Sequence, residues 1–160
     1  MITQSAASIP EARTGVELRY ALIPAHGHGI AVATVARMLD GEGGGDRARV
    51  LSPSESIPYG AQPVLLAEST VYGMSCVEQL LQQWGPLPRP WLVLVSDAPA
   101  RPVPDARYLV RALGSRLAGV AQVPYLPVLR AVKSPDEALE HKDVLAAADK
   151  LRRTMEGNRS

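Results

Sequence analysis

The sequence has no phenylalanine, one cysteine and few lysines among its 160 residues. The single cysteine, Cys76, cannot form an internal disulfide, so cysteine usage does not indicate an oxidising compartment. Apolar runs are far shorter than a membrane span, and residues 1–15 lack the basic start and apolar run of a signal peptide. The formal net charge of +1 creates no strong field that would attract nucleic acid or anionic lipid. These absences predict a cytoplasmic protein with no membrane span, and they do not indicate a nucleic-acid partner.

The length of the chain predicts one domain with a proper core. We interpret residues 1–15 as a flexible N-terminal tail and residues 16–156 as a single α/β domain. Turn signals such as Gly43-Gly44-Gly45 and Pro58-Tyr59-Gly60 predict an irregular loop at about 42–62. That loop has room only for a short strand near Arg49–Leu51.

Strands and helices alternate in the predicted order of elements. Apolar or alternating runs indicate strands over residues 16–23, 62–68, 91–95 and 119–123. Helical spacing and caps indicate helices over residues 30–39, 75–84, 105–113 and 134–157. The helix after the second strand is expected to begin at Ser75, which forms a capping box with Glu78. Tyr108 and Leu145 are expected to be available for burial on their helices, and the continuous apolar run at 91–95 is expected to be the central strand. The alternation predicts an α/β three-layer sandwich with a mostly parallel sheet.

The most informative stretch runs from the first strand through Ala25-His26-Gly27-His28-Gly29 into a helix. A glycine loop between a strand and a helix can cradle phosphate, because backbone N–H groups and the helix dipole both face the anion. In open α/β sheets, ligands bind outside the carboxyl ends of the strands. The candidate residues for phosphate or ligand binding are His26, Gly27, His28, Gly29, Thr34, Ser69, Asp97, Pro124 and Tyr125.

The two histidines of this loop allow three interpretations. They could bind a metal ion together with Asp97 or Glu68, but two imidazoles are too few ligands, so no metal site is predicted. A neutral imidazole beside backbone N–H groups could help to bind a weak anion or phosphate. The third interpretation is that the rings form hydrogen bonds with main chain or solvent. No catalytic residue is predicted, since the chain has no Gly-x-Ser-x-Gly elbow.

Three motifs carry a resemblance to a known class of proteins. They are Ala25-His26-Gly27-His28-Gly29, Leu94-Val95-Ser96-Asp97-Ala98-Pro99 and Val123-Pro124-Tyr125. Together with the order of elements over residues 16 to 155, they make the chain similar to the MinD/ParA class of P-loop ATPases. The likeness is closest to an uncharacterised actinobacterial family that shares the three motifs. It implies a P-loop NTPase-like topology, in which the segment around Pro124 packs main chain around adenine.

The chain differs from that class at the residues that bind and position the phosphates. The resemblance aligns the Walker pattern with Gly27 to Thr34. Ala31 then replaces the last glycine, Val32 the phosphate-binding lysine, and Ala33 the magnesium-binding hydroxyl. No other register restores the lysine, because Lys133 is the first lysine in the chain. An apolar residue at this position removes both charge stabilisation and positioning of the transferred phosphoryl group. We therefore expect a poor ATPase.

The resemblance and its departures together predict a non-catalytic or weakly active binding or regulatory module, a pseudo-ATPase. The likeness implies an accessory protein of a mobile genetic element that acts through a protein partner or self-association. No cofactor is predicted beyond weak binding of ATP or another anion. The alternative is a nucleotide-binding ATPase that takes its cation from Arg37 or from an arginine of a partner chain.

Overall fold

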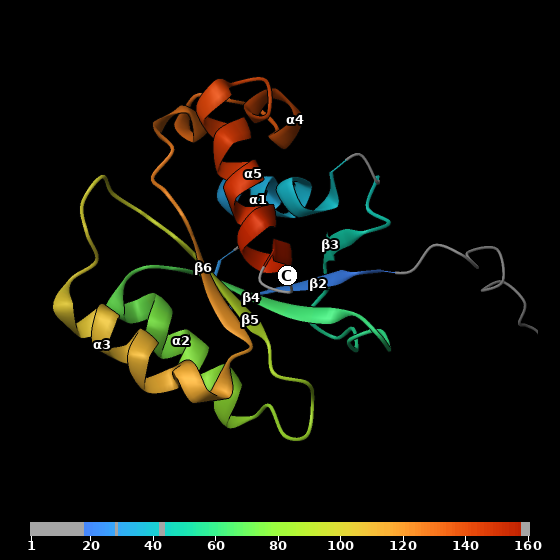
Figure 1. The fold of residues 1–160 in the computed structure, drawn as a ribbon, viewed down its shortest axis with the longest axis vertical. Helices are drawn as coiled ribbons and strands as arrows, with labels where there is room; N and C mark the ends of the chain where they lie inside the picture. The colour runs from blue at the N-terminus through green and yellow to red at the C-terminus, as the bar shows by residue number, and fades with distance from the viewer. Residues whose placement is uncertain (1–17, 28, 42–43, 158–160) are drawn as a thin grey trace, which may run out of the picture.

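The computed structural model describes residues 18–27, 29–41 and 44–157. In this part of the chain a sheet lies between two layers of helices (Figure 1). The strands are β2 (Tyr20–Pro24), β3 (Ala48–Val50), β4 (Gln62–Glu68), β5 (Trp91–Val95) and β6 (Gly119–Val123). The helices are α1 (Ile30–Asp40), α2 (Val71–Gln82), α3 (Pro104–Leu113), α4 (Pro135–Ala138) and α5 (Lys142–Gly157), with short 3₁₀ turns at η2 (Gly114–Arg116) and η3 (Pro127–Arg130).

The five described strands pair in the order β3-β2-β4-β5-β6, and every neighbouring pair is parallel. Counted along the chain this is the order 2-1-3-4-5 of flavodoxin-like doubly wound sheets. The order reverses between β2 and β4, so the crevice outside their carboxyl ends is the topological switch point. The predicted α/β three-layer sandwich with a parallel sheet is confirmed.

Both faces of the sheet are covered because its strands are apolar on both sides. Leu22 and Leu66 pack into one core cluster with α1 and α5, while Leu65 and Ala67 pack into a second cluster with α2 and α3. Figure 1 shows these two helix pairs on opposite sides of the sheet. Among the described helices, none is both long and apolar enough to cross a membrane.

Most predicted boundaries agree with the structure. The strands predicted at 62–68, 91–95 and 119–123 are β4, β5 and β6, and the helix predicted at 30–39 is α1, which ends before the Gly41 cap. The short strand predicted near 49–51 is β3. The prediction that β5 is the central strand is wrong: it is an interior strand, and β4 is in the middle. The predicted tail, residues 1–15, lies outside the described residues.

The predicted start of α2 is also wrong, by one turn. The helix begins at Val71, because Thr70 caps it by accepting a hydrogen bond from the backbone N–H of Gly73 at 2.9 Å. Ser75 therefore lies inside the helix, and its predicted capping box with Glu78 does not form the N-terminus. The helix ends at Gln82, so Trp84 lies beyond it.

The last predicted helix is in fact two helices. The backbone N–H groups of Glu140 and His141 bond to carbonyls three residues back, which closes α4 before α5 begins. Leu145, expected to face inward, is 47% exposed on α5. Tyr108 on α3 is likewise exposed, because Ala106 and Leu113 form the buried side of that helix.

Candidate functional site

A cavity of about 270 Å³ lies at the topological switch point. The glycine loop contributes His26, Gly27 and Gly29, and the first turn of α1 contributes residues 30–32. The carboxyl end of β4, residues 66–68, closes the other side. This is the position at which doubly wound sheets bind ligands, so the cavity is the first candidate site.

His26 connects the glycine loop to the beginning of the next strand–helix unit. Its Nε2 atom accepts a hydrogen bond from the backbone N–H of Glu68 at 3.1 Å. Its ring also meets Tyr72 of α2 edge to face, with 5.4 Å between ring centroids. Of the three interpretations of this side chain, the hydrogen bond to main chain is the one confirmed. The Nε2 atom of His26 therefore accepts its hydrogen bond from within the protein.

The backbone of the glycine loop leads into α1, and the N-terminus of this helix has no side-chain cap. Gly27 has φ of +55°, the left-handed region that side chains with a Cβ rarely adopt. Gly29 is the N-cap of α1, and no side chain caps the helix there. The first N–H groups of a helix have no partner within it, so they give the cavity a weak positive end.

The side chains around this cavity do not strengthen that positive end. No lysine or arginine of the described residues lines it, whereas the acidic Glu68 does. Ala31 and Val32 stand where the resemblance places the last glycine and the lysine, and both pack partly against the core. His28 lies outside the described residues. The local charge therefore disfavours a highly charged anion such as a triphosphate.

Thr34 is a predicted site residue that the structure places in the core. It is fully buried, and its Oγ1 atom has no hydrogen-bond partner among the described residues. It does not line the switch-point cavity.

We expect Thr34→Val to leave the free energy of unfolding unchanged or to raise it by about 1 kcal/mol, because an unpaired buried hydroxyl is replaced by a methyl group of similar size. Urea unfolding followed by tryptophan fluorescence measures the change. A loss of stability would instead reveal a partner for the hydroxyl.

The remaining predicted residues do not converge on the switch point. Ser69 is buried and lines a cavity of about 200 Å³ that is otherwise lined mainly by α3 and by residues of α2, β5 and β6. Pro124 and Tyr125 line another cavity of about 590 Å³ beyond the ends of β5 and β6. Asp97 is exposed and lines neither of these cavities. The predicted residues are thus divided among three cavities along the carboxyl edge of the sheet, while Thr34 lies in the core and Asp97 lines none of the three.

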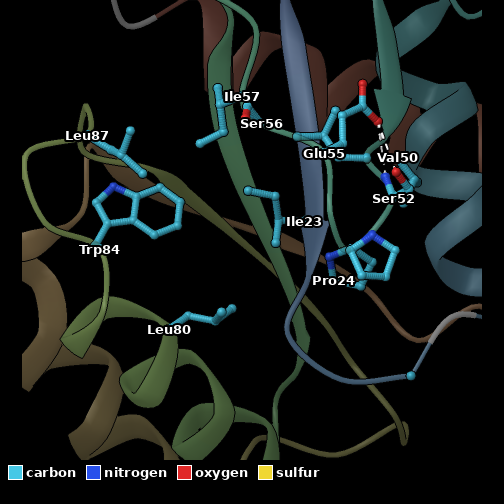
Figure 2. Close-up of a pocket in the computed structure, with 13 residues that line it drawn as sticks. Ile23, Pro24, Val50, Ser52, Glu55, Ser56, Ile57, Leu80, Trp84 and Leu87 are labelled. Atoms are coloured by element: carbon cyan, nitrogen blue, oxygen red, sulfur yellow. Dashed lines mark hydrogen bonds between the residues drawn. The ribbon is translucent and has the colours of Figure 1, made fainter.

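Sequence reasoning missed a larger apolar groove of about 940 Å³. Figure 2 shows Leu80, Trp84 and Leu87 on one side of it, Val50, Ser52 and Glu55 on the other, and Ile23 between them. The groove lies over β2 on the face that α2 and α3 cover elsewhere. Its lining is mostly aliphatic and aromatic, which suits an apolar surface better than a charged ligand.

The groove exists because the connection from β3 to β4 contains no helix. Residues 51–61 form turns and irregular chain, in keeping with Pro53 and Pro58, so no helix of the described residues covers β2 on this face. The irregular loop predicted at about 42–62 was the signal that could have located the groove. Which strand this loop leaves uncovered depends on the order of strands in the sheet, and that order could not be predicted from the sequence.

An ion pair lies on the outer wall of the groove. The guanidinium of Arg49 donates two hydrogen bonds to the carboxylate of Glu55, and the backbone N–H of Ser52 donates a third at 3.2 Å. The Arg49 hydrogen bond is the main cause that lowers the pKa of Glu55 to about 2. Any stabilisation from this pair is complete above the ordinary pKa of 4.5 and is lost as the pH falls from there through about 2.

The described residues contain no cluster of side chains that could bind a metal ion. Within residues 18–27, 29–41 and 44–157, no three His, Cys, Asp or Glu side chains lie close enough together to hold an ion.

The chain matches no protein-family model, and neither a curated protein nor a solved structure is significantly similar to it. The geometry of the cavities is therefore what bears on function.

Proposed function

We propose that this protein is a non-catalytic or weakly active binding and regulatory module with a MinD/ParA-like fold, which acts through a protein partner or through self-association. The observation that carries the proposal is the chemistry of the switch-point cavity. Its side chains provide Glu68 and no cation from the described residues, and its volume of about 270 Å³ is small for a nucleotide. A role beside the transfer or partition machinery of a mobile element is implied by the resemblance alone.

The order of elements supports a MinD/ParA-like topology without establishing it. A strand, a glycine loop and α1 follow one another, β5 precedes Asp97-Ala98-Pro99, and β6 precedes Pro124-Tyr125. The flavodoxin-like strand order does not by itself identify a P-loop protein, since many functions share doubly wound sheets. The topology therefore remains part of the proposal.

The apolar groove supports binding over catalysis. It exposes Trp84, Leu87 and Ile57 in a concave surface, and concave apolar surface of this kind is typical of interaction sites. The ion pair of Arg49 and Glu55 joins β3 to the following loop along one wall of the groove.

The alternative is an ATPase that takes its cation from an arginine. Within the chain, Arg37 does not favour this function. It lies in the last turn of α1, away from the glycine loop, where its Nη2 atom is 2.8 Å from Asp136 and its Nη1 atom donates to the carbonyl of Gly41. The alternative function therefore needs an arginine from a partner chain.

Calorimetric titration with ATP and magnesium discriminates between the two functions. The binding-module proposal expects at most weak binding, in the millimolar range. Micromolar binding accompanied by slow hydrolysis would overturn it and would support the ATPase.

The double variant Val32→Lys with Ala31→Gly is expected to gain at least about tenfold in affinity for ATP and magnesium, because the side chain at position 32 lines the cavity and a lysine there would supply the missing cation. Ser115→Lys, at an exposed position on η2, is the matched control for added charge and should gain nothing. An equal gain in both variants would mean that the cavity does not hold the phosphates.

A further inference from the structure

An arginine-rich cavity lies at the same carboxyl edge of the sheet as the glycine loop, but on the side of β5 and β6. It has a volume of about 590 Å³ and opens beyond the carboxyl ends of β5 and β6, beside α3. Arg101 and Arg107 line it together with the polar side chains of Ser96, Gln122 and Tyr125. Carboxylates are absent from its lining among the described residues. The volume lies within the usual range for small-molecule sites.

Arg107 is the distinctive residue of this cavity. With Pro102 and Gln122 it also lines the neighbouring cavity of about 200 Å³, so its side chain lies between the two. The second cavity adds another arginine, Arg111, and no carboxylate. Three arginines therefore line these two neighbouring cavities beside α3.

None of these three arginines forms an ion pair within the described part of the chain. The Nε atom of Arg107 is buried and has no hydrogen-bond partner there. A buried donor without an acceptor is destabilising, and few such groups occur in folded proteins. The arginines that serve structure in this protein, such as Arg49 and Arg152, instead donate to carboxylates or carbonyls.

We propose that this cavity binds the oxyanion group of a small molecule, a phosphate or a carboxylate, through Arg107 and Arg101. A guanidinium binds such groups with two parallel hydrogen bonds. The Nε of Arg107 is buried in the ligand-free protein, so a turn of this side chain toward the ligand would give that atom an acceptor. Arg101 supplies a second positive charge at the same cavity, and Tyr125 offers a ring surface for the remainder of the ligand. The site goes beyond the proposed function, since it shares no residue with the glycine loop.

Calorimetry at low salt, about 20 mM, tests the site with inorganic phosphate in one arm and malonate in the other. We expect at least one of the two to bind with millimolar affinity or tighter. Arg107→Met should weaken that binding about tenfold or more, and Arg107→Lys should weaken it as well because the fork geometry is lost. The arm that binds more tightly identifies the oxyanion.

The thermal midpoint, measured with and without ligand, distinguishes a ligand-binding arginine from a structural one. Because Nε is unpaired without ligand, Arg107→Met should leave the thermal midpoint of the ligand-free protein unchanged or higher, while the stabilisation by phosphate or malonate disappears. Arg116→Met is the matched control: it removes an exposed arginine on η2 and should alter neither quantity.

Either of two results would overturn the proposal, and a third would do so together with a further variant. The first is no binding of either probe at about 10 mM. The second is an equal loss of affinity in Arg116→Met, which would indicate diffuse charge instead of a site. The third is a large loss of ligand-free stability in Arg107→Met combined with unchanged binding in Arg101→Met.

Discussion

Replacing Gly73 by alanine is expected to lower the free energy of unfolding by at least about 3 kcal/mol. A Cβ atom at this position would lie 2.3 Å from the backbone carbonyl oxygen of Glu68 and 3.0 Å from Nε2 of His26. The carbonyl belongs to Glu68 at the end of β4, where the strand is paired with Val95 of β5, so a shift of this carbonyl would disturb the sheet. The imidazole is equally constrained, because it accepts the hydrogen bond from Glu68.

The sign of this effect makes the test sharp. Alanine is favoured over glycine inside a helix by about 1 kcal/mol, so helix propensity alone predicts that Gly73→Ala stabilises the protein. Gly114→Ala is the matched control, because its backbone is helical with φ of −57° and a Cβ there meets nothing within 4 Å. Urea unfolding of both variants should show a large loss for the first and a neutral or slightly favourable change for the second. A stabilised Gly73→Ala would refute the close packing of His26 against α2.

Replacing Asp40 by alanine is expected to lower the free energy of unfolding by about 3 kcal/mol. This carboxylate is 1% exposed at the end of α1. It accepts hydrogen bonds from the backbone N–H groups of Gly45 at 2.7 Å, Arg47 at 2.9 Å and Ala48 at 3.0 Å. It thereby fastens α1 to the start of β3, and its loss leaves the buried N–H of Ala48 without an acceptor.

Two further variants separate hydrogen bonding from charge at this position. Asp40→Asn keeps one carbonyl oxygen, which can still serve Arg47 and Ala48, so its loss should be smaller than that of Asp40→Ala. Asp46→Ala changes an exposed aspartate in the same turn and should alter stability by less than about 0.5 kcal/mol. An Asp46→Ala effect as large as that of Asp40→Ala would mean that a general charge effect is being measured.

The contribution of Asp40 should depend on pH in a defined direction. Burial raises the pKa of this carboxyl, but the N–H groups of Gly45, Ala48 and Arg47, with the nearby charge of Arg37, outweigh it and lower the pKa below the usual value. A lowered pKa gives stability that is complete above the unfolded-state value, about 3.9, and is lost as the pH falls through the folded-state value. The difference between wild type and Asp40→Ala should therefore be constant from pH 7 to about 5 and shrink below about pH 4. Urea midpoints measured across this range check it.

The sequence by itself determined the elements whose signals are local. The apolar runs of β4, β5 and β6 and the glycine at the end of α1 set boundaries that the structure confirms, because strand burial and helix termination depend on neighbouring residues. Residue counts also decided that no lysine can stand at the glycine loop. The fold class followed from the alternation of these elements.

Only the tertiary structure decided which side chains share a cavity. Thr34 lies near the glycine loop in sequence yet is buried in the core, and His26 is engaged by Glu68, 42 residues away. The groove over β2 follows from strand order and from a missing helix, and the pairing of Arg101 with Arg107 at one cavity follows from where α3 packs. Contacts between residues distant in the chain depend on the packing of whole elements, which a local pattern does not encode.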